Sequence, residues 1–456
     1  MTEEEGGGAG AGITRTHGDP LAAAARRVLR ANDTGRWTVP SRAQYPHQWN
    51  WDSAFVAIGL STFDWERAAA EIEAILAARW REGMLPHVRY DPRRLVDYFP
   101  GPDRWPRAQA HVADSAVRTS GITNPPVVVT AALLVGRRQP DRARRLAFWR
   151  RTFPPLRALV QYLRRERRLP GSPLLVVVHP WESGWDNSPR WDHLRRARLR
   201  PRHPYTRQDA RHVPAADRPL DADYDGYLAL VELLDEADYD LRAYRERSPF
   251  CVHDVLMDAL WYRAARDLNE IAGELGVPAS VDRGELDEFA AAFEARHWDP
   301  RLGLYVDWDC VRGRRIARPT AAGVVALAGG LIGPERARAT WTRYRELTGG
   351  VRPVATVPPG DPAFDARRYW RGPVWAPANW LVADGLAAVG LPREAARVAE
   401  ATLALVRGAG FAEYFDPVTG AACGAGDFSW TAAVALDLLA QEASSAGGSS
   451  MPGTRP

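Results

Sequence analysis

Hydrophobic and polar residues recur with a helical period along most of this chain. At residues 64–80 an aspartate suited to a helix N-cap precedes apolar residues that share one helical face, namely Trp65, Ala68, Ile72, Ile75 and Leu76. Comparable patterns predict helices at residues 21–31, 127–135, 143–164, 227–237, 252–275, 285–297, 321–331, 334–347, 376–389, 393–406 and 428–441. One run alone, residues 174–178, has the composition of a strand.

This succession of helices, joined by short Gly/Pro turns and interrupted by long Trp-rich loops, predicts one large all-α domain. In an (α/α)6 barrel, a six-hairpin toroid, inner helices are buried all round and outer helices are amphipathic. The Ala-rich residues 321–331 fit the inner ring, and the arginine-bearing residues 334–347 fit the outer ring. A helical solenoid is the alternative, although the chain has no repeat of fixed period. Periodicity favours the barrel and leaves its closure open.

The two ends of the chain differ from the helical part in composition. Residues 1–17 and 444–456 are rich in Gly, Ser and Pro and are predicted to be disordered, which leaves residues 18–443 as one folded domain. We expect neither a signal peptide nor a membrane span, because no apolar run has the required position or length. Cys251, Cys310 and Cys423 lack metal-site or disulfide spacing, which favours the reducing cytoplasm.

The charge of the chain is nearly balanced. All 60 basic residues are arginine, against 56 acidic residues, so the net charge is +4. The densest basic stretch, residues 195–211, contains one acidic residue, Asp209. We interpret this stretch as a solvated loop rather than a polyanion site, and expect no nucleic-acid partner.

The long loops carry polar and aromatic residues that a helical core does not need. They are YPHQWNWD (45–52), TSGITNPP (119–126), WESGWDNSPRW (181–191), YWRGPVWAPANW (369–380) and FAEYFDPVTGAACGAGDFSW (411–430). Pyranose rings have apolar C–H faces that stack on Trp and Tyr, and hydroxyl groups that need carboxylate, amide or guanidinium partners. The loops therefore predict a binding site for a small glycoside.

Two carboxyl groups in these loops are candidates for catalysis. Hydrolysis of a glycosidic bond needs one protonated and one ionised carboxyl group. Asp186 stands between Trp185 and Asn187, surroundings that favour a raised pKa, and Glu413 precedes the last helix. Each has a structural alternative, as a turn or capping residue and as a loop anchor, respectively. The coincidence of several such loops favours the catalytic interpretation.

Taken together, these segments resemble glycoside hydrolase family 63, above all its short bacterial members that hydrolyse mannosylglycerate and glucosylglycerate. The motifs WNWDS, SGIT-x-PP, ESGWDNSPRW, YWRGPVW-x-P-x-NW and E-Y-F-x-P-x-T-G follow one another in order from Tyr45 to Thr431. The resemblance implies an (α/α)6 barrel and inversion of the anomeric carbon. It also implies that Asp186 is the general acid and Glu413 the general base.

The resemblance extends to the residues that bind substrate. Family positions for the sugar fall on Tyr45, Trp49, Asp52, Tyr369, Trp370 and Trp375, and those for glycerate on Tyr98, Asn124, Arg218 and Tyr224. An arginine suits an anionic leaving group, although Arg218 has a structural alternative in an ion pair with Asp217 or Asp221. The family carries Gln where this chain has Asn124, which is shorter by one methylene, so the leaving group is the uncertain part of the substrate.

The resemblance predicts an inverting α-glycosidase that hydrolyses 2-O-α-glucosyl- or mannosyl-glycerate. We expect no metal or organic cofactor, because acid–base hydrolysis needs none. One alternative is a trehalase, oligosaccharide α-glucosidase or debranching activity on the same barrel, and another is a non-catalytic carbohydrate-binding protein. Terpene cyclases also form helical toroids, but DADYD at residues 221–225 lacks their acidic spacing. The choice of glucose or mannose and the oligomeric state stay open.

Overall fold

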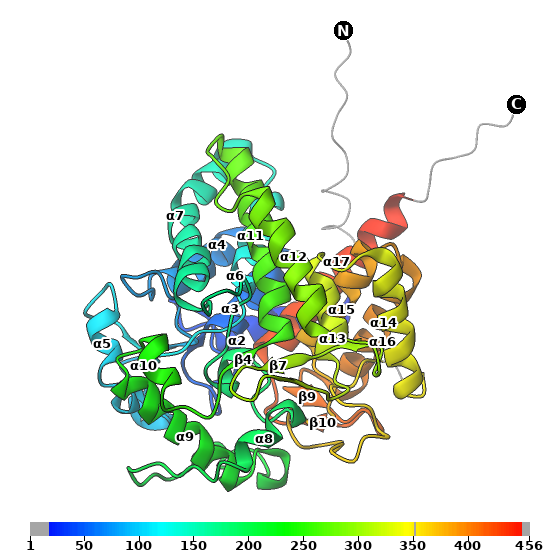
Figure 1. The fold of residues 1–456 in the computed structure, drawn as a ribbon. Coiled ribbons are helices and arrows are strands. Elements are labelled where there is room, and N and C mark those ends of the chain that lie inside the picture. Colours follow the sequence, from blue (N-terminus) through cyan, green and yellow to red (C-terminus); the bar gives the residue numbers. More distant parts are fainter. Residues whose placement is uncertain (1–17, 351–352, 449–456) are drawn as a thin grey trace, which may run out of the picture.

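The helices pack side by side in the centre of the molecule (Figure 1), and their contacts close them into a ring. The computed structural model describes residues 18–350 and 353–448. Within these residues each inner element contacts the next, and the last contacts the first. In ring order they are α3 (Asn50–Leu60), α6 (Val127–Arg137), α11 (Val255–Leu275), α13 (Ala322–Val325) with the 3-10 turn η7 (Ala326–Gly329), α15 (Ala376–Ala388) and α17 (Ser429–Gly448). The barrel predicted from the sequence is therefore closed.

A second set of helices packs around this ring. They are α2 (Pro20–Asn32) on α17, α4 (Trp65–Leu76) on α3 and α6, α7 (Arg142–Glu166) on α6 and α11, α12 (Arg283–His297) on α11, α14 (Pro334–Leu347) on α13, and α16 (Pro392–Ala409) on α15 and α17. The (α/α)6 architecture is confirmed. The N-cap predicted for residues 64–80 is also confirmed, because the Asp64 carboxylate accepts the N–H of Arg67.

Two inner elements differ from the prediction. Residues 50–52 were expected in a loop, but they begin α3, in which every residue is buried. A helix with no polar face lacks the periodic signal of an amphipathic one, so the pattern missed it. The helix predicted at residues 321–331 does lie in the inner ring, but it is divided into α13 and η7.

The inner elements approach one another closely at glycines. A Cβ atom at Gly329 would lie 2.6 Å from the backbone oxygen of Ala259 in α11, and one at Gly385 of α15 would lie 2.5 Å from the backbone nitrogen of Ala328. Both distances are too short for real carbon contacts, so these positions require glycine. Close contact on both sides of η7 is what allows the short element to complete the ring.

Short strands and helices gather at one end of the ring (Figure 1). In the described chain the sheets have the orders β1-β2-β3, β4-β7-β8, β5-β6 and β9-β10. The strands are β1 (Gln48–Trp49), β2 (Val88–Tyr90), β3 (Arg118–Thr119), β4 (Val252–His253), β5 (Trp298–Asp299), β6 (Leu304–Tyr305), β7 (Asp307–Asp309), β8 (Arg314–Ile316), β9 (Tyr414–Phe415) and β10 (Ala422–Cys423). The longest helix outside the two rings is α9 (Asp221–Glu236). The short helical elements are α5 (Ala108–His111), α8 (Asp192–Arg195), α10 (Leu241–Arg245), η2 (Leu95–Asp97), η3 (Pro102–Arg104), η4 (Pro180–Ser183), η5 (Pro189–Trp191) and η6 (Ala215–Asp217).

Residues 174–178, predicted as a strand, form only isolated bridges. Leu175 bridges to Arg168, and Val177 bridges to Val252. The N–H of Leu175 is taken by the carboxylate of Asp258 at 2.7 Å, so this part of the backbone has no continuous strand partner. The strand prediction is therefore wrong.

The predicted boundaries also need adjustment. Helix α9 begins at Asp221 rather than at residue 227, because the Asp223 carboxylate accepts the N–H of Leu220 and caps an earlier turn. Helix α17 continues through Gly448, so residues 444–448 are helical and the tail predicted from residue 444 is wrong there. Residues 1–17 and 449–456 lie outside the described residues.

The arginine-rich stretch at residues 195–211 is paired with carboxylates of α9. The pairs include Arg195 with Asp223, Arg200 with Asp225, and Arg202 with Glu236. Its positive charge is balanced locally, as expected of a loop rather than of a polyanion surface. Among the described helices, none combines the length and the apolarity needed to cross a bilayer.

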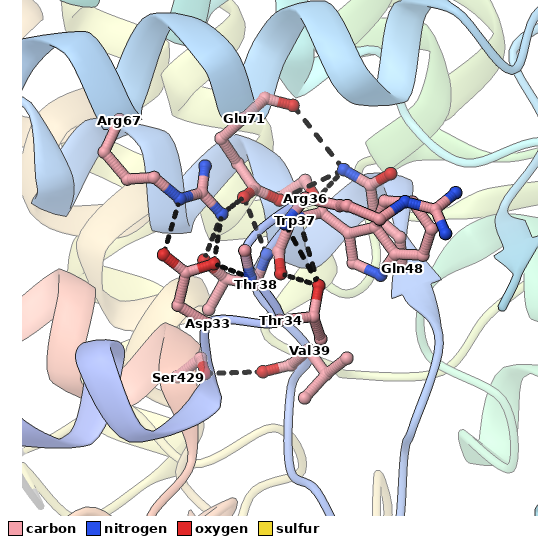
Figure 2. A network of polar contacts seen from close by, with 12 residues as sticks. Asp33, Thr34, Arg36, Trp37, Thr38, Val39, Gln48, Arg67, Glu71 and Ser429 are labelled. Carbon is pink, nitrogen blue, oxygen red and sulfur yellow. Dashed lines mark hydrogen bonds and ion pairs between the residues drawn. The ribbon is translucent and has the colours of Figure 1, made fainter. Parts of the chain in front are cut away.

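A buried carboxylate ties the outer helix α4 to the segment that leads into the site. Figure 2 shows Glu71 at the centre of this network. The Glu71 carboxylate pairs with Arg67 at 2.6 Å and accepts hydrogen bonds from the Thr38 N–H at 2.8 Å, Ser53 Oγ at 2.5 Å and Gln48 Nε2 at 3.1 Å. The network therefore fixes residues on both sides of Tyr45.

We expect Glu71→Ala to lower the free energy of unfolding by roughly 3–5 kcal/mol, because it leaves the buried Thr38 N–H and Ser53 hydroxyl without an acceptor and removes one of the two carboxylates that pair with Arg67, which keeps only Asp33. Urea denaturation followed by tryptophan fluorescence measures the change. Glu73→Ala is the matched control on the same helix, since Glu73 pairs with Arg151 in solvent; its effect should stay below about 1 kcal/mol. Equal effects of the two substitutions would contradict the role given to Glu71.

Candidate active site

A cavity opens among the loops that precede the inner helices. It contains about 740 Å³ of space free of protein atoms, part of it open to solvent. Every residue predicted for the site lines it except Trp375; these are Tyr45, Trp49, Asp52, Tyr98, Asn124, Asp186, Arg218, Tyr224, Tyr369, Trp370 and Glu413. Loops far apart in the sequence therefore meet in one place.

The N-terminal ends of inner helices provide much of this wall. Trp49 is the N-cap of α3 and Asp52 lies in its first turn. Asn124 precedes α6, Trp370 precedes α15, and Trp430 is the second residue of α17. The partial positive charge at a helix N-terminus stabilises nearby anions, so this end of the ring suits carboxylates and an anionic ligand.

Asp186 is buried in the wall of the cavity. Burial raises the pKa of its carboxyl group to about 7, the Glu413 carboxylate adds to this rise, and the Arg218 guanidinium opposes it. Among the described residues, no side chain of another residue donates a hydrogen bond to the Asp186 carboxyl group; the Tyr227 hydroxyl donates to its backbone oxygen at 2.9 Å. The environment therefore favours the protonated acid near neutral pH.

The loop that carries Asp186 is anchored by a buried arginine. The Arg190 guanidinium pairs with Asp254 at 2.8 Å and Asp307 at 3.0 Å, at the start of α11 and in β7. It also lies over the ring of Trp191, 4.4 Å from its centroid. Because all three charged side chains are buried, the loop cannot shift without separating them.

Glu413 has a contrasting environment. One carboxylate oxygen accepts the Ala425 N–H at 2.9 Å, and the other accepts the Tyr45 hydroxyl at 2.8 Å and Arg218 Nη1 at 3.4 Å. Burial raises the pKa of Glu413 above its ordinary value, and Arg218 and the other two donors oppose this rise. These three donors stabilise the ionised carboxylate, whereas Asp186 has no comparable set.

Arg218 connects Glu413 to a second carboxylate, Asp209. Its Nε atom lies 3.3 Å from Asp209, and its guanidinium carbon lies 4.2 Å from the centre of the Tyr369 ring. The expected alternative, an ion pair with Asp217 or Asp221, is wrong: these two carboxylates pair with other arginines, Arg367 and Arg207.

Four stacked aromatic rings join the loop of Asp186 to that of Glu413. Trp185 stacks on Trp370 with centroids 5.0 Å apart, Trp370 on Trp375 at 3.8 Å, and Trp375 on Tyr414 at 4.5 Å. Trp185 directly precedes Asp186 and Tyr414 directly follows Glu413. Trp375, predicted to bind sugar, instead lies behind Trp370 as an inner member of this stack.

The cavity also includes residues that sequence reasoning missed. Trp51, Trp181, Gly184, Phe428 and Trp430 line it and belong to the loops already singled out. Pro40, His87 and Asp209 line it from outside those loops, and no local signal marks them. Asp209 even stood in the stretch interpreted as a solvated loop. The arrangement as a whole offers two carboxyl groups with different proton affinities in an aromatic, sugar-sized cavity.

The chain is similar to known proteins over most of its length. Residues 45–431 match the mannosylglycerate hydrolase MGH1-like glycoside hydrolase domain. Mannosylglycerate hydrolase of Thermus thermophilus is 42% identical over 418 residues, covering 90% of this chain and 98% of the relative. Glucosylglycerate hydrolase of Mycolicibacterium hassiacum is 36% identical over 441 residues, covering 92% and 97%.

A solved structure gives the same result. The crystal structure of a family 63 mannosylglycerate hydrolase from Thermus thermophilus, in complex with Tris and D-glycerate, aligns with a TM-score of 0.85 and 40% identity. The alignment covers 92% of this chain and 99% of the other. The chain is therefore a glycoside hydrolase and belongs to the mannosylglycerate hydrolase MGH1-like group of family 63.

Proposed function

We propose that this enzyme hydrolyses 2-O-α-glucosyl- or mannosyl-glycerate with inversion, and that Asp186 is the general acid and Glu413 the general base. The observation that carries the proposal is the pair of buried carboxyl groups that line one cavity, of which only Glu413 accepts hydrogen bonds from other described residues. The relatives named above, one of which holds D-glycerate, support the choice of substrate.

In the proposed reaction Asp186 donates its proton to the glycosidic oxygen as the bond to the anomeric carbon breaks. Glu413 takes a proton from a water molecule that attacks this carbon from the opposite face. The products are the hexose, with inverted configuration, and glycerate. This geometry requires the two carboxyl groups to lie roughly 6.5–9.5 Å apart, which stays a prediction.

The rest of the cavity suits the two halves of the substrate. Trp49 and Trp370 present aromatic surface to a sugar ring. Burial raises the pKa of Asp52, and the charge of Glu413 raises it further, so this carboxyl group can both donate to and accept from sugar hydroxyls.

Arg218 is the proposed partner of the glycerate carboxylate. Its Nε and Nη1 atoms contact Asp209 and Glu413, while Nη2 has no hydrogen-bond partner among the described residues. A guanidinium has five donors, so a substrate carboxylate can use those that remain. A neutral leaving group, as in the substrates of a trehalase or oligosaccharide α-glucosidase, would leave these donors unused. A protein that only binds carbohydrate would need no acid–base pair.

We further propose that residues 18–448 form one catalytic domain that works in the cytoplasm without a cofactor. Cys251, Cys310 and Cys423 are free, although Cys251 and Cys310 are adjacent across neighbouring strands, where the Cys310 N–H donates to the Cys251 carbonyl. Adjacent free thiols favour a reducing compartment. Activity that survives exhaustive chelation would support the absence of a metal.

Asp186→Asn and Glu413→Gln should each lower kcat by about 10²- to 10⁴-fold, because each removes a proton-transfer group. The substrates are glucosylglycerate, mannosylglycerate, trehalose, kojibiose and maltose, with the anomer of the product followed by NMR. Unchanged unfolding midpoints show that the fold is intact. Normal turnover by either variant refutes the role proposed for the substituted residue. Activity on maltose without activity on glucosylglycerate or mannosylglycerate refutes the proposed choice of substrate.

The pH dependence follows from the environment of the two carboxyl groups. Asp186 must be protonated, so kcat/KM should fall as the pH rises through its pKa, at about 7 in the free enzyme. Arg218 lowers the pKa of both Asp186 and Glu413, so Arg218→Gln should move both limbs of the profile to higher pH. Arg195→Gln removes an arginine that pairs with Asp223 and is not among the named charges that shift the pKa of either carboxyl group, so it should move neither limb. Unmoved limbs in Arg218→Gln would contradict this electrostatic role.

Trp375→Phe should lower kcat by up to about 10²-fold and change KM little, since it disturbs the stack that sets the acid–base spacing without touching the cavity wall. Trp261→Phe is the control, because Trp261 is fully buried in α11 and packs on Phe289 instead. Steady-state kinetics and thermal unfolding of both variants separate positioning from general destabilisation. Equal kcat values in the two variants would rule out the positioning role.

A further inference from the structure

One acceptor in the wall of the cavity has no partner. Asn124 is 4% exposed, and its Nδ2 donates to the backbone oxygen of Trp181 at 3.2 Å. Its Oδ1 is buried without a hydrogen bond from any described residue. Since a carbonyl oxygen accepts and never donates, the bond to Trp181 requires the nitrogen there, and the oxygen is therefore the free atom.

The residues around Asn124 form a continuous wall. Asn124 is bonded to Trp181, whose ring stacks on His87 with centroids 6.2 Å apart and packs against Tyr224 at 6.3 Å. The Nδ1 atom of His87 is already engaged by Ser120 at 2.6 Å. All but Ser120 line the cavity. The unpartnered oxygen thus belongs to a built binding surface rather than to the core.

The length of this side chain decides what the wall presents. Where the resembled family has Gln, Asn124 is shorter by one carbon–carbon bond, about 1.5 Å. Its amide nitrogen is also committed to the Trp181 backbone. Compared with a Gln, the wall is therefore set back by about one methylene and offers an acceptor. A buried acceptor favours a ligand that donates a hydrogen bond to it and disfavours a carboxylate there.

We propose that Asn124 adapts the leaving-group end of the cavity to a 2-hydroxy acid one hydroxymethylene longer than glycerate, a 2,3,4-trihydroxybutanoate. Its terminal hydroxyl donates to Asn124 Oδ1 and occupies the space left by the shorter side chain. This inference rests on the proposed function. The reaction is unchanged: water cleaves the bond between the anomeric carbon and O2 of the acid, giving the hexose and free trihydroxybutanoate.

The test compares three α-glucosides, in which the leaving group is 2,3,4-trihydroxybutanoate, glycerate or lactate, joined in each case through O2. The native enzyme should show kcat/KM for the trihydroxybutanoate glycoside at least roughly 10-fold above that for the glycerate, as expected for one methylene and one hydrogen bond. Lactate, which lacks the terminal hydroxyl, should be the poorest.

Two variants separate length from hydrogen bonding. Asn124→Gln restores the missing methylene and should reverse the preference toward glycerate by roughly 10-fold. Asn124→Leu keeps the number of heavy atoms and the branching of the side chain but has no acceptor, so it should abolish the preference for trihydroxybutanoate without improving hydrolysis of the glycerate glycoside. Thermal unfolding of both variants checks that the fold is retained.

The outcomes distinguish this inference from the function on which it rests. If the native enzyme prefers the glycerate glycoside, or if Asn124→Gln changes all three rates by the same factor, the role of Asn124 is overturned while the proposed function stands. If none of the three glycosides is hydrolysed, nor the mannosyl analogues, the proposed function fails and the inference with it.

Discussion

The aromatic stack from Trp185 to Tyr414 is the constraint on which the site depends. Its outer rings are the immediate neighbours of Asp186 and Glu413, and its inner rings, Trp370 and Trp375, are packed 3.8 Å apart. Stacked rings resist compression, and the distance between them cannot increase without loss of their contact. Two loops separated by more than two hundred residues are thereby held at one spacing, while flexible side chains alone would leave that spacing free.

Burial makes this spacing chemically useful. Asp186, Glu413 and Asp52 all lie in the cavity wall, and in each case burial raises the pKa. Arg218 contacts only Glu413 among the three, at 3.4 Å, so the guanidinium distinguishes one carboxyl group from its neighbours. A difference in proton affinity between similar groups is what acid–base hydrolysis needs, and unequal access to a single cation provides it.

The sequence predicted the parts of the molecule that have local signals. The bounds of α14 agree with the prediction of residues 334–347, because its arginine-bearing face and its buried face alternate along the chain. Helix α3 has no such alternation and was missed. Motifs identified the loops of the site, but Trp370 and Trp375 share one motif, and only tertiary packing decides which of them faces the cavity. Asp209 and His87 enter the site through contacts that no local pattern records.

The sequence analysis treated two roles of Arg218 as alternatives, a structural ion pair and a contact with substrate. In this structure the two roles are compatible. Its partners Asp209 and Glu413 both line the cavity, so the ion pairs that hold the guanidinium also hold Glu413, the proposed base. A buried cation between two carboxylates has little freedom to move, because separation would leave a charge unpaired. In the proposed reaction a substrate carboxylate therefore meets a donor that is already oriented. The same guanidinium favours the ionised form of Glu413, so both proposed roles of Arg218 follow from one arrangement.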